Sequence, residues 1–351
     1  MKNKKFFTKS LLEWNCNDNK RKMPWKGEKD PYKIWISEII LQQTRVQQGL
    51  AYYQRFIKAF PDAKSLAAAP EQKVFKLWEG LGYYSRCRNL LASAKYIDSE
   101  LNGKFPENYT DILALKGVGD YTASAIASFA YNQPHAVLDG NVFRVLSRFF
   151  GIKTPVDTPA GKKLYSLLAS DLLDKKEPGI YNQAIMDFGA IICKPAQPLC
   201  DLCALQLKCA AFNKHLVNIL PVKEKSIKRK ERFFNYLIVE YADSMYVRKR
   251  IDKDIWQSLY EFILLETNQV LTGKDLLKTE LFASFFAKKK YSITAESSTY
   301  KQQLTHQTIT GKFFHIKIST PLTFENDLVL VTKEQIRQLA FPKFIASYLI
   351  D

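Results

Sequence analysis

The sequence contains no long run of apolar residues, although 46% of its 351 residues are hydrophobic. A helix needs roughly 20 apolar residues in succession to cross the hydrocarbon core of a membrane, and no segment approaches that length. The basic start of the chain is followed by the segment Phe6 to Trp14, which polar and charged residues interrupt, so it lacks the apolar core of a secretory signal. We therefore expect a soluble, cytoplasmic protein without membrane contact.

Acidic residues are scarce relative to basic ones. The chain has 35 Asp and Glu against 52 Lys and Arg, which gives a formal net charge of +17. Such an excess favours a polyanionic partner, because each phosphate that a basic side chain neutralises releases condensed counterions. Charge alone indicates nonspecific binding of nucleic acid, so a more specific function requires a site for chemistry as well.

Internal repeats and low-complexity tracts are also missing, and the length predicts two domains. Apolar residues recur at i, i+3 and i+4 through the first part of the chain, which predicts a mainly helical domain over residues 1–215. Residues 216–232 are rich in Lys and Arg and offer little to bury, so we interpret them as a linker. Short apolar runs such as Phe233–Tyr241 then predict strands and an α+β domain over residues 233–351.

Cysteine is sparse, with 6 residues, but four of them share the loop 193–209 in the spacing C-x6-C-x2-C-x5-C. Four thiolates from one loop suit either tetrahedral zinc or a [4Fe-4S] cluster. A structural zinc site usually pairs two short C-x2-4-C knuckles, whereas only Cys200 and Cys203 form one here, so the spacing favours the cluster over zinc. A disulfide framework is not expected in a reducing compartment. The candidate ligands are Cys193, Cys200, Cys203 and Cys209.

A Gly-x-Gly turn joins two predicted helices between Thr110 and Ser124. Because Gly117 and Gly119 carry no Cβ atom, the backbone amides at the start of the second helix can approach a phosphate closely, and the helix dipole favours that contact. A plain helical hairpin with a glycine cap is the alternative. The neighbouring motifs favour the phosphate-binding interpretation.

Two carboxylates are candidates for acid–base work. Asp139 and Asn141 stand at the start of a predicted helix, where an aspartate can also be an ordinary N-cap. A short loop after the preceding helix places Asp139 beside Tyr121, and Glu38, on a helix predicted for Tyr32–Gln48, offers a second carboxylate. Hydrolysis of a glycosidic bond uses such a pair, because one carboxyl protonates the leaving group while the other stabilises positive charge on the sugar.

The Gly117-Val-Gly119 hairpin, the Leu138–Asn141 segment and the four-cysteine loop together resemble the helix-hairpin-helix base-excision DNA glycosylases that carry an iron–sulfur cluster. Within that superfamily the chain is similar, over almost its whole length, to the MutY-type adenine DNA glycosylases. Further matching motifs are Met23-Pro-Trp25, Trp35–Glu38, Leu41–Thr44, Gly80–Tyr84 and Asn182-Gln-Ala184. The resemblance implies one [4Fe-4S] cluster on the four cysteines. It also implies a monomer that acts on double-stranded DNA containing 8-oxoguanine:adenine or guanine:adenine mispairs.

The resemblance implies a role for individual residues as well. Glu38 would protonate adenine at N7, provided that burial raises its pKa, and Asp139 would stay ionised and stabilise the oxocarbenium-like sugar. Tyr121 and Asn141 would form hydrogen bonds around that centre. Residues that match the family's adenine pocket are Arg21, Trp25 and Gln183. Residues that match its DNA contacts are Gln43, Thr44, Leu81, Tyr83, Gly117, Gly119, Thr305 and His306.

Two alternative functions stay open. Glycosylases of the endonuclease III type share the hairpin, the aspartate and the cluster, but they use a lysine nucleophile at the position of Tyr121. A phenol cannot form a Schiff base with a sugar aldehyde, so we expect no efficient cleavage of the strand. The other alternative is a non-catalytic iron–sulfur protein that binds DNA, and the joint presence of Glu38, Tyr121 and Asp139 argues against it.

The C-terminal region resembles the Nudix-like lesion-recognition module of the same family around Trp256–Phe262. It lacks the acidic Arg-Glu-x-x-Glu-Glu box that would bind magnesium, so we expect recognition without hydrolysis of a pyrophosphate. The family loop that reads 8-oxoguanine has the sequence Phe-Ser-His, and the matching stretch here is Leu304-Thr-His306. Thr305 keeps the hydroxyl, whereas Leu304 departs from the aromatic residue.

Overall fold

The computed structural model describes residues 3–224, 228–286, 289–322 and 327–350. The chain divides into two compact units, Met1–Ala68 with Asn89–Lys225 and Ala69–Arg88 with Ser226–Asp351. The segment 69–88 thus groups with the C-terminal part of the chain, although helices precede and follow it in the sequence. Within the predicted linker, residues 225–227 lie outside the described residues, and the first strand already begins at Lys230.

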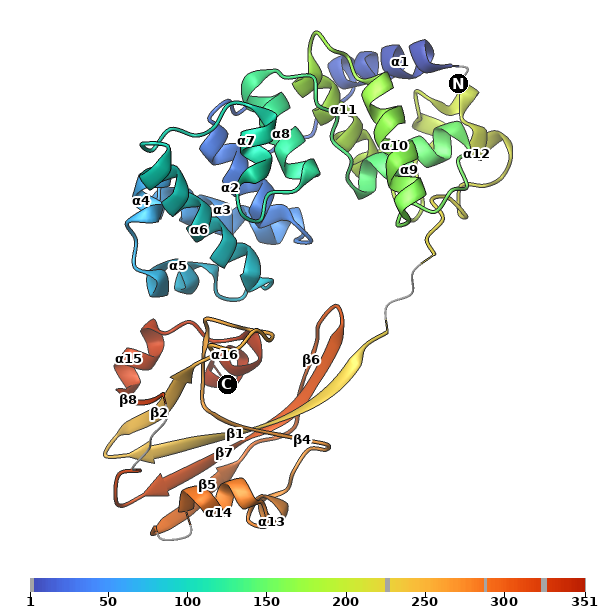
Figure 1. Ribbon diagram of the computed structural model, residues 1–351. Helices are drawn as coiled ribbons and strands as arrows, with labels where there is room; N and C mark the ends of the chain where they lie inside the picture. The colour runs from blue at the N-terminus through green and yellow to red at the C-terminus, as the bar shows by residue number, and fades with distance from the viewer. Residues whose placement is uncertain (1–2, 225–227, 287–288, 323–326, 351) are drawn as a thin grey trace. The chain divides into compact units, whose positions relative to one another are not determined.

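The first unit is helical, as predicted (Figure 1). Short polar side chains start several of its helices: Asp30 accepts a hydrogen bond from the amide of Tyr32, and Thr158 accepts one from the amide of Gly161. Its elements are α1 (Lys4–Asn17), α2 (Pro31–Leu41), α3 (Val46–Ala59), α4 (Ala63–Ala67), the greater part of α6 (Tyr84–Glu100), α7 (Tyr109–Ala114), α8 (Asp120–Tyr131), α9 (Gly140–Phe150), α10 (Pro159–Leu172), α11 (Pro178–Ile191), the 3-10 turns η1 (Cys200–Leu202) and η2 (Gln206–Lys208), and α12 (Ala210–Asn213).

A large core of this unit forms where α1, α9, α10 and α11 pack together. Fully buried members include Phe7, Leu11, Leu146, Tyr165 and Phe188. The helix α11 buries residues on most of its circumference, which holds it rigidly among its neighbours. The N-terminal ends of α9 and α11 are thereby fixed relative to one another.

The single helix predicted for Tyr32–Gln48 is wrong. The helix α2 ends at Leu41, and Gln42 (ψ 111°) and Gln43 (φ 56°) leave the helical backbone before α3 begins at Val46. The apolar spacing that suggested one helix continues across this turn, because both helices bury a face in the same unit. Residues 42–45 therefore form a turn after Glu38.

The second unit contains α5 (Glu71–Trp78) and an eight-stranded sheet. The path through the sheet is β3-β2-β1-β7-β5, in which β1 and β7 run parallel, while β4 pairs with β1, β6 with β7, and β8 with β2. The strands are β1 (Lys230–Tyr241), β2 (Ser244–Lys249), β3 (Tyr260–Glu261), β4 (Ile263–Thr267), β5 (Tyr291–Glu296), β6 (Tyr300–Gln303), β7 (Gln307–Ile318) and β8 (Leu328–Thr332), and the other helices are α13 (Gly273–Leu276), α14 (Glu280–Phe286), α15 (Lys333–Gln338) and α16 (Lys343–Ile350).

Helices cover both faces of this sheet (Figure 1). Successive residues of a strand point to opposite faces, so Leu237 and Val239 of β1 pack with the phenylalanines of α14. Tyr236 points the other way and lies against Phe344 of α16, with 6.2 Å between the ring centroids. The predicted α+β class is confirmed. Among the described residues, no helix combines the length and the apolar character needed to cross a membrane.

Candidate active site

A pocket of about 370 Å³ opens in the helical unit between α2, α8, the start of α9 and α11. Its volume falls in the usual range of small-molecule sites. The structure brings the following predicted residues together around it: Arg21, Trp25, Glu38, Thr44, Tyr121, Asp139, Asn141 and Gln183. Thr44, which the resemblance places against DNA, is thus also part of this pocket.

Glu38 lies on α2 with only 6% of its surface exposed. Its carboxylate accepts a hydrogen bond from the phenol of Tyr121. Burial raises the pKa of Glu38 to about 7, although the Tyr121 hydrogen bond opposes this shift, and the charge of Asp139 adds to it. Near neutral pH Glu38 therefore keeps its proton in a large share of the molecules, as a general acid requires.

Asp139 is both the N-cap of α9 and part of the pocket wall. One carboxylate oxygen accepts a hydrogen bond from the amide of Val142 at 2.8 Å, and the other accepts one from the side-chain amide of Asn141 at 2.7 Å. Burial raises the pKa of Asp139, and these hydrogen bonds and the positive charge of Arg144 counteract that rise. Capping and a chemical role are therefore compatible, because capping holds the carboxylate in one orientation.

Arg144 links the start of α9 to the cysteine loop, and the sequence analysis did not identify it. Its guanidinium donates to the side-chain oxygen of Asn141 at 2.8 Å, to the carbonyl of Gly189 at 2.7 Å and to the carbonyl of Cys193 at 2.7 Å. The side chain is 8% exposed. An arginine three residues after Asn141, among the apolar residues Val142, Phe143 and Val145, was the available signal.

Asp187 is the second residue that sequence reasoning missed. Its fully buried side chain accepts hydrogen bonds from Arg21 at 2.7 Å, from Lys26 at 3.1 Å and from Gln183 at 3.0 Å. All three donors line the pocket. The i, i+4 spacing of Gln183 and Asp187 on α11 could have indicated this contact.

Trp25 completes one wall of the same pocket. Its ring meets that of Tyr53 edge to face, with 5.4 Å between the centroids. Edge-to-face contact is a favourable arrangement of two aromatic rings, so it fixes the plane that Trp25 presents to the cavity.

The four cysteines follow α11 on the loop 193–209. Burial raises the pKa of the Cys203 thiol to about 12 and also raises those of Cys200 and Cys209, and neighbouring cysteines contribute to each rise. The thiol of Cys209 donates to the carbonyl of Arg148 at 3.5 Å. The guanidinium of Arg148 lies 3.4 Å from the sulfur of Cys193. It also donates to the carbonyl of Lys194 at 2.7 Å, so it ties the loop to α9. Within the described part of the chain, no group of three or more His, Cys, Asp or Glu side chains is arranged to hold a metal ion.

The predicted helix-turn-helix is present as α7, a turn at residues 115–119, and α8. Gly117 has φ +83°, which side chains rarely tolerate, and a Cβ atom there would lie 2.6 Å from the Cβ of Asn89. Gly119 is the N-cap of α8, and a Cβ atom there would meet nothing within 4 Å. The first amides of α8 are therefore accessible to a phosphate, and the helix dipole favours an anion at this end.

A second pocket, of about 430 Å³, lies within the second unit. Predicted DNA-contact residues that line it are Leu81, Tyr83, Thr305 and His306. Tyr83 is 43% exposed, and its phenol and the hydroxyl of Thr305 are hydrogen-bonded. Gln43 lines neither pocket and stands exposed in the turn after α2.

A helical hairpin with accessible amides, beside a pocket that holds two carboxyl groups, defines the helix-hairpin-helix class of DNA glycosylases. Residues 36–169 match the family model of the HhH-GPD superfamily base excision DNA repair proteins, and residues 235–350 match that of the NUDIX domain. A thermostable thymine-DNA glycosylase superposes with a TM-score of 0.56 at 30% identity, covering 61% of this chain and 98% of that one. A complex of endonuclease III with DNA superposes with a TM-score of 0.52 at 21% identity, covering 62% of this chain and 99% of that one, which shows a shared fold.

Curated relatives specify the family within this class. An adenine DNA glycosylase of Buchnera aphidicola subsp. Baizongia pistaciae is 34% identical over 86% of this chain and 84% of its own length. The adenine DNA glycosylase of Mus musculus is 40% identical over 59% of this chain and 42% of its own length. The chain therefore belongs to the adenine DNA glycosylase family, and it is a DNA glycosylase of base excision repair.

Proposed function

We propose that the protein hydrolyses the N-glycosidic bond of adenine paired with 8-oxoguanine or guanine in double-stranded DNA. The observation that carries this proposal is the pair of carboxyl groups in one pocket, of which Glu38 has a pKa of about 7 and Asp139 is fixed by hydrogen bonds to α9. One group can give a proton near neutral pH, and the other can face a developing positive charge.

The reaction begins after the adenine leaves the duplex and enters the pocket, a step that costs a few kcal/mol. Glu38 donates its proton to N7 of adenine, so the base departs as a neutral species. Asp139 stabilises the oxocarbenium-like sugar until water adds at C1'. The proton that this water releases passes to the solvent, from which Glu38 regains the proton it gave to adenine. Tyr121 holds the Glu38 carboxyl through its hydrogen bond, and Asn141 holds Asp139. Since Tyr121 replaces the lysine of a lyase, the strand stays intact.

The base would be held by Arg21, Trp25 and Gln183. Trp25 offers a flat face whose plane Tyr53 fixes, and the other two side chains offer hydrogen-bond donors. The buried carboxylate of Asp187 accepts from both donors, so it orients the groups that would meet the edge of the base. Thr44 closes the pocket on the side of the turn that carries Gln43.

The base opposite adenine would be recognised outside the adenine pocket. Gln43 and Tyr83 are exposed and stand in left-handed conformations outside regular helix, so they can enter the base stack. The pocket with Leu81, Thr305 and His306 would receive 8-oxoguanine, and the turn at Gly117 and Gly119 would bind a backbone phosphate.

The cysteine loop fits a [4Fe-4S] cluster by the chemistry of its donors. The thiols of Cys193, Cys200, Cys203 and Cys209 come from one loop, influence one another electrostatically, and have the positive charge of Arg148 beside them to offset thiolate charge. When bound, the cluster would hold this loop in one conformation. We propose that the protein works as a cytoplasmic monomer.

A panel of duplexes tests the substrate. We expect the purified protein to generate alkali-labile sites where adenine faces 8-oxoguanine or guanine, and none where cytosine or thymine faces them. Borohydride should trap no covalent protein–DNA adduct efficiently, because Tyr121 cannot form an imine. Strand cleavage without alkali, together with efficient trapping, would instead support the endonuclease III type of chemistry. A preparation that binds DNA and releases no base from any duplex would support the non-catalytic alternative.

Asp187→Asn tests the arrangement of the base pocket. The change keeps the size of the side chain but removes the charge that binds Arg21 and Lys26, so these cations and Gln183 lose their orientation. We expect the rate of adenine release to fall on the order of 10- to 100-fold, the scale of a small misplacement of binding groups. Single-turnover kinetics measures it. Asp171→Asn is the matched control, since Asp171 pairs with Lys4 at an exposed position and should leave the rate unchanged. An unchanged rate in Asp187→Asn would contradict the prediction.

A further inference from the structure

Two loops of the second unit carry residues that line the second pocket. One loop lies between β2 and β3 and contributes Asp254, Ile255 and Trp256. The other, the hairpin loop 302–307, comprises the end of β6, the turn 304–306 and Gln307 at the start of β7. The two loops are far apart in the sequence. Backbone hydrogen bonds tie each loop to its neighbouring strand, from the amide of Lys230 to the carbonyl of His306 and from the amide of Ser258 to the carbonyl of Arg250. Side-chain contacts then connect the two loops to one another.

The loop between β2 and β3 has a strained backbone. Trp256 has φ 62° and Ser258 has φ 74°, which lie in the left-handed region of backbone conformation that residues other than glycine seldom adopt. Such residues cost about 1–3 kcal/mol each and persist only where the surroundings hold them. The guanidinium of Arg250 helps to do so, because it donates to the carbonyl of Ile255 at 3.0 Å and to Asp254 at 3.0 Å.

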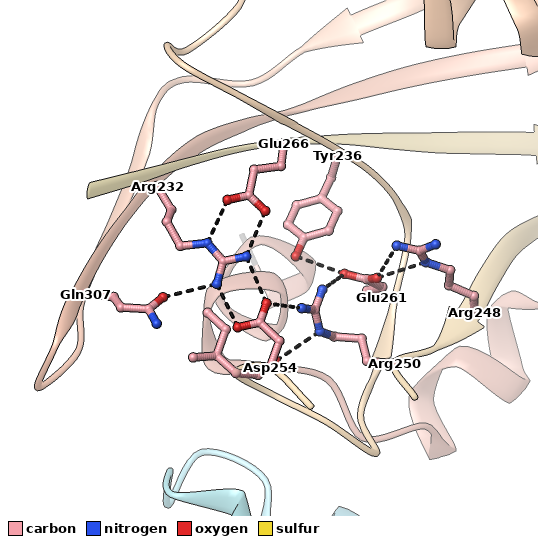
Figure 2. Close-up of polar contacts among 9 residues, drawn as sticks. Arg232, Tyr236, Arg248, Arg250, Asp254, Glu261, Glu266 and Gln307 are labelled. Atoms are coloured by element: carbon pink, nitrogen blue, oxygen red, sulfur yellow. Dashed lines mark hydrogen bonds and ion pairs between the residues drawn. The ribbon is translucent and has the colours of Figure 1, made fainter. Parts of the chain in front are cut away.

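Arg232 joins the two loops through one guanidinium (Figure 2). It lies on β1 with 11% of its side chain exposed, and it forms two hydrogen bonds of 2.8 Å with the carboxylate of Asp254. The same guanidinium donates to the side-chain oxygen of Gln307 at 3.2 Å. Asp254 and Gln307 each line the pocket, one from each loop.

The partners of Arg232 are themselves fixed. Glu266 of β4 accepts two further hydrogen bonds of 2.7 Å from Arg232, which leaves the guanidinium little freedom to turn. Asp254 also pairs with Arg250, and Arg250 pairs with the buried Glu261 of β3 (Figure 2). Bidentate contacts of this kind specify geometry as well as charge. The network thus connects both loops to β1, β3 and β4.

We propose that Arg232 is a positioning residue that sets the separation of the two loops, and through it the preference of the second pocket for 8-oxoguanine over guanine. The inference about preference rests on the proposed function of that pocket. Arg232 itself does not line the pocket, so it acts through Asp254 and Gln307. The two bases differ only at C8 and N7, where 8-oxoguanine has a carbonyl oxygen and an N–H in place of the C8 hydrogen and the bare N7 of guanine. Such a small difference requires close placement of the pocket groups, which loose loops could not provide.

Arg232→Met in the full-length protein is the test. The guanidinium of Arg232 lies 4.8 Å from the centre of the Phe234 ring. Methionine keeps an apolar side chain beside this ring but removes the guanidinium and its paired hydrogen bonds. We expect hydrogen–deuterium exchange to become about tenfold faster in both loops, since their shared anchor is lost. The ratio of the single-turnover rates with 8-oxoguanine and with guanine opposite adenine should fall about tenfold, on the scale of misplaced binding groups.

Two further variants keep the outcome decisive. Glu266→Gln keeps one oxygen that can accept from Arg232 and leaves the hydrogen bonds to Asp254 and Gln307 in place, so it should leave the ratio and the exchange of the 302–307 loop as in the wild type. Arg232→Lys keeps the charge but cannot form the paired hydrogen bonds of a guanidinium, so it should reproduce the loss seen with methionine. This variant provides the test if the methionine variant does not fold.

Three results would overturn the proposal: unchanged exchange and ratio in Arg232→Met, an equal loss in Glu266→Gln, or restoration of the wild-type ratio by Arg232→Lys. A wild-type protein with equal rates opposite both bases would contradict the proposed function of the pocket. In that case exchange in the two loops still decides whether Arg232 positions them.

Discussion

Glu38→Gln should abolish adenine release and, at the same time, make the protein more stable above neutral pH. The amide cannot donate a proton to the leaving base, and loss of a general acid at a poor leaving group costs at least about 10² to 10⁴ in rate. The wild-type rate should itself fall as pH rises through about 7, because Glu38 loses its proton there. Single-turnover rates between pH 5 and pH 9 measure the loss of activity in the variant and the pH dependence of the wild type. An active Glu38→Gln variant would contradict the assignment of the acid.

Glu38→Gln should lower the activity but raise the stability of the fold above neutral pH. The pKa of Glu38 is raised from 4.5 to about 7 in the folded protein, so the folded state holds a proton that the unfolded state has released in this range. The stability that the proton provides is complete below about pH 4.5 and is lost as pH rises through about 7. At pH 8 the ionised carboxylate costs up to about 3 kcal/mol of unfolding free energy, which the amide avoids.

Thermal melts test this difference in stability. We expect a higher melting temperature for Glu38→Gln than for the wild type at pH 8, and a difference that shrinks towards pH 5. Glu13→Gln at an exposed site of α1 is the control, and it should show no such trend. A difference that is the same at both pH values would mean that Glu38 does not titrate in this range.

Asp139→Asn should give the second large loss of activity. Asparagine still caps α9, because its side-chain oxygen can accept from the amide of Val142, but it carries no charge to stabilise a positive sugar. We expect a fall in single-turnover rate of about 10³-fold, the scale for loss of one preorganised electrostatic group. The melting temperature at neutral pH should not fall, because burial raises the pKa of Asp139 and asparagine lacks the charge that burial disfavours.

Asp62→Asn is a matched control for this variant. Asp62 caps α4 through the amide of Ser65 at 2.7 Å and does not line the pocket, so the same chemical change should leave the rate intact. A comparable loss of activity in both variants would attribute the effect to weaker capping. A wild-type rate in Asp139→Asn would remove Asp139 from the mechanism.

Local sequence patterns predicted the parts of the fold that depend on neighbouring residues. The glycines at 117 and 119, the helical periodicity of the first part and the short strands of the second part all appear in the structure. The turn at Gln43 was missed because the helical spacing of apolar residues resumes at once after the polar residues 42–45. Asp187 was missed because its partners Arg21 and Lys26 lie far from it in the sequence.

The sequence by itself determined which chemical groups are available: two candidate carboxyls, a tyrosine in place of a lyase lysine, and four thiols on one loop. Only the tertiary structure decided how these groups behave. The pKa of Glu38 depends on burial and on Tyr121, and the grouping of residues 69–88 with the C-terminal unit depends on contacts across the chain. The physical reason is the number of residues on which each property depends. The conformation of a turn follows from a few adjacent residues, whereas the solvation and ionisation of a side chain follow from everything that packs around it.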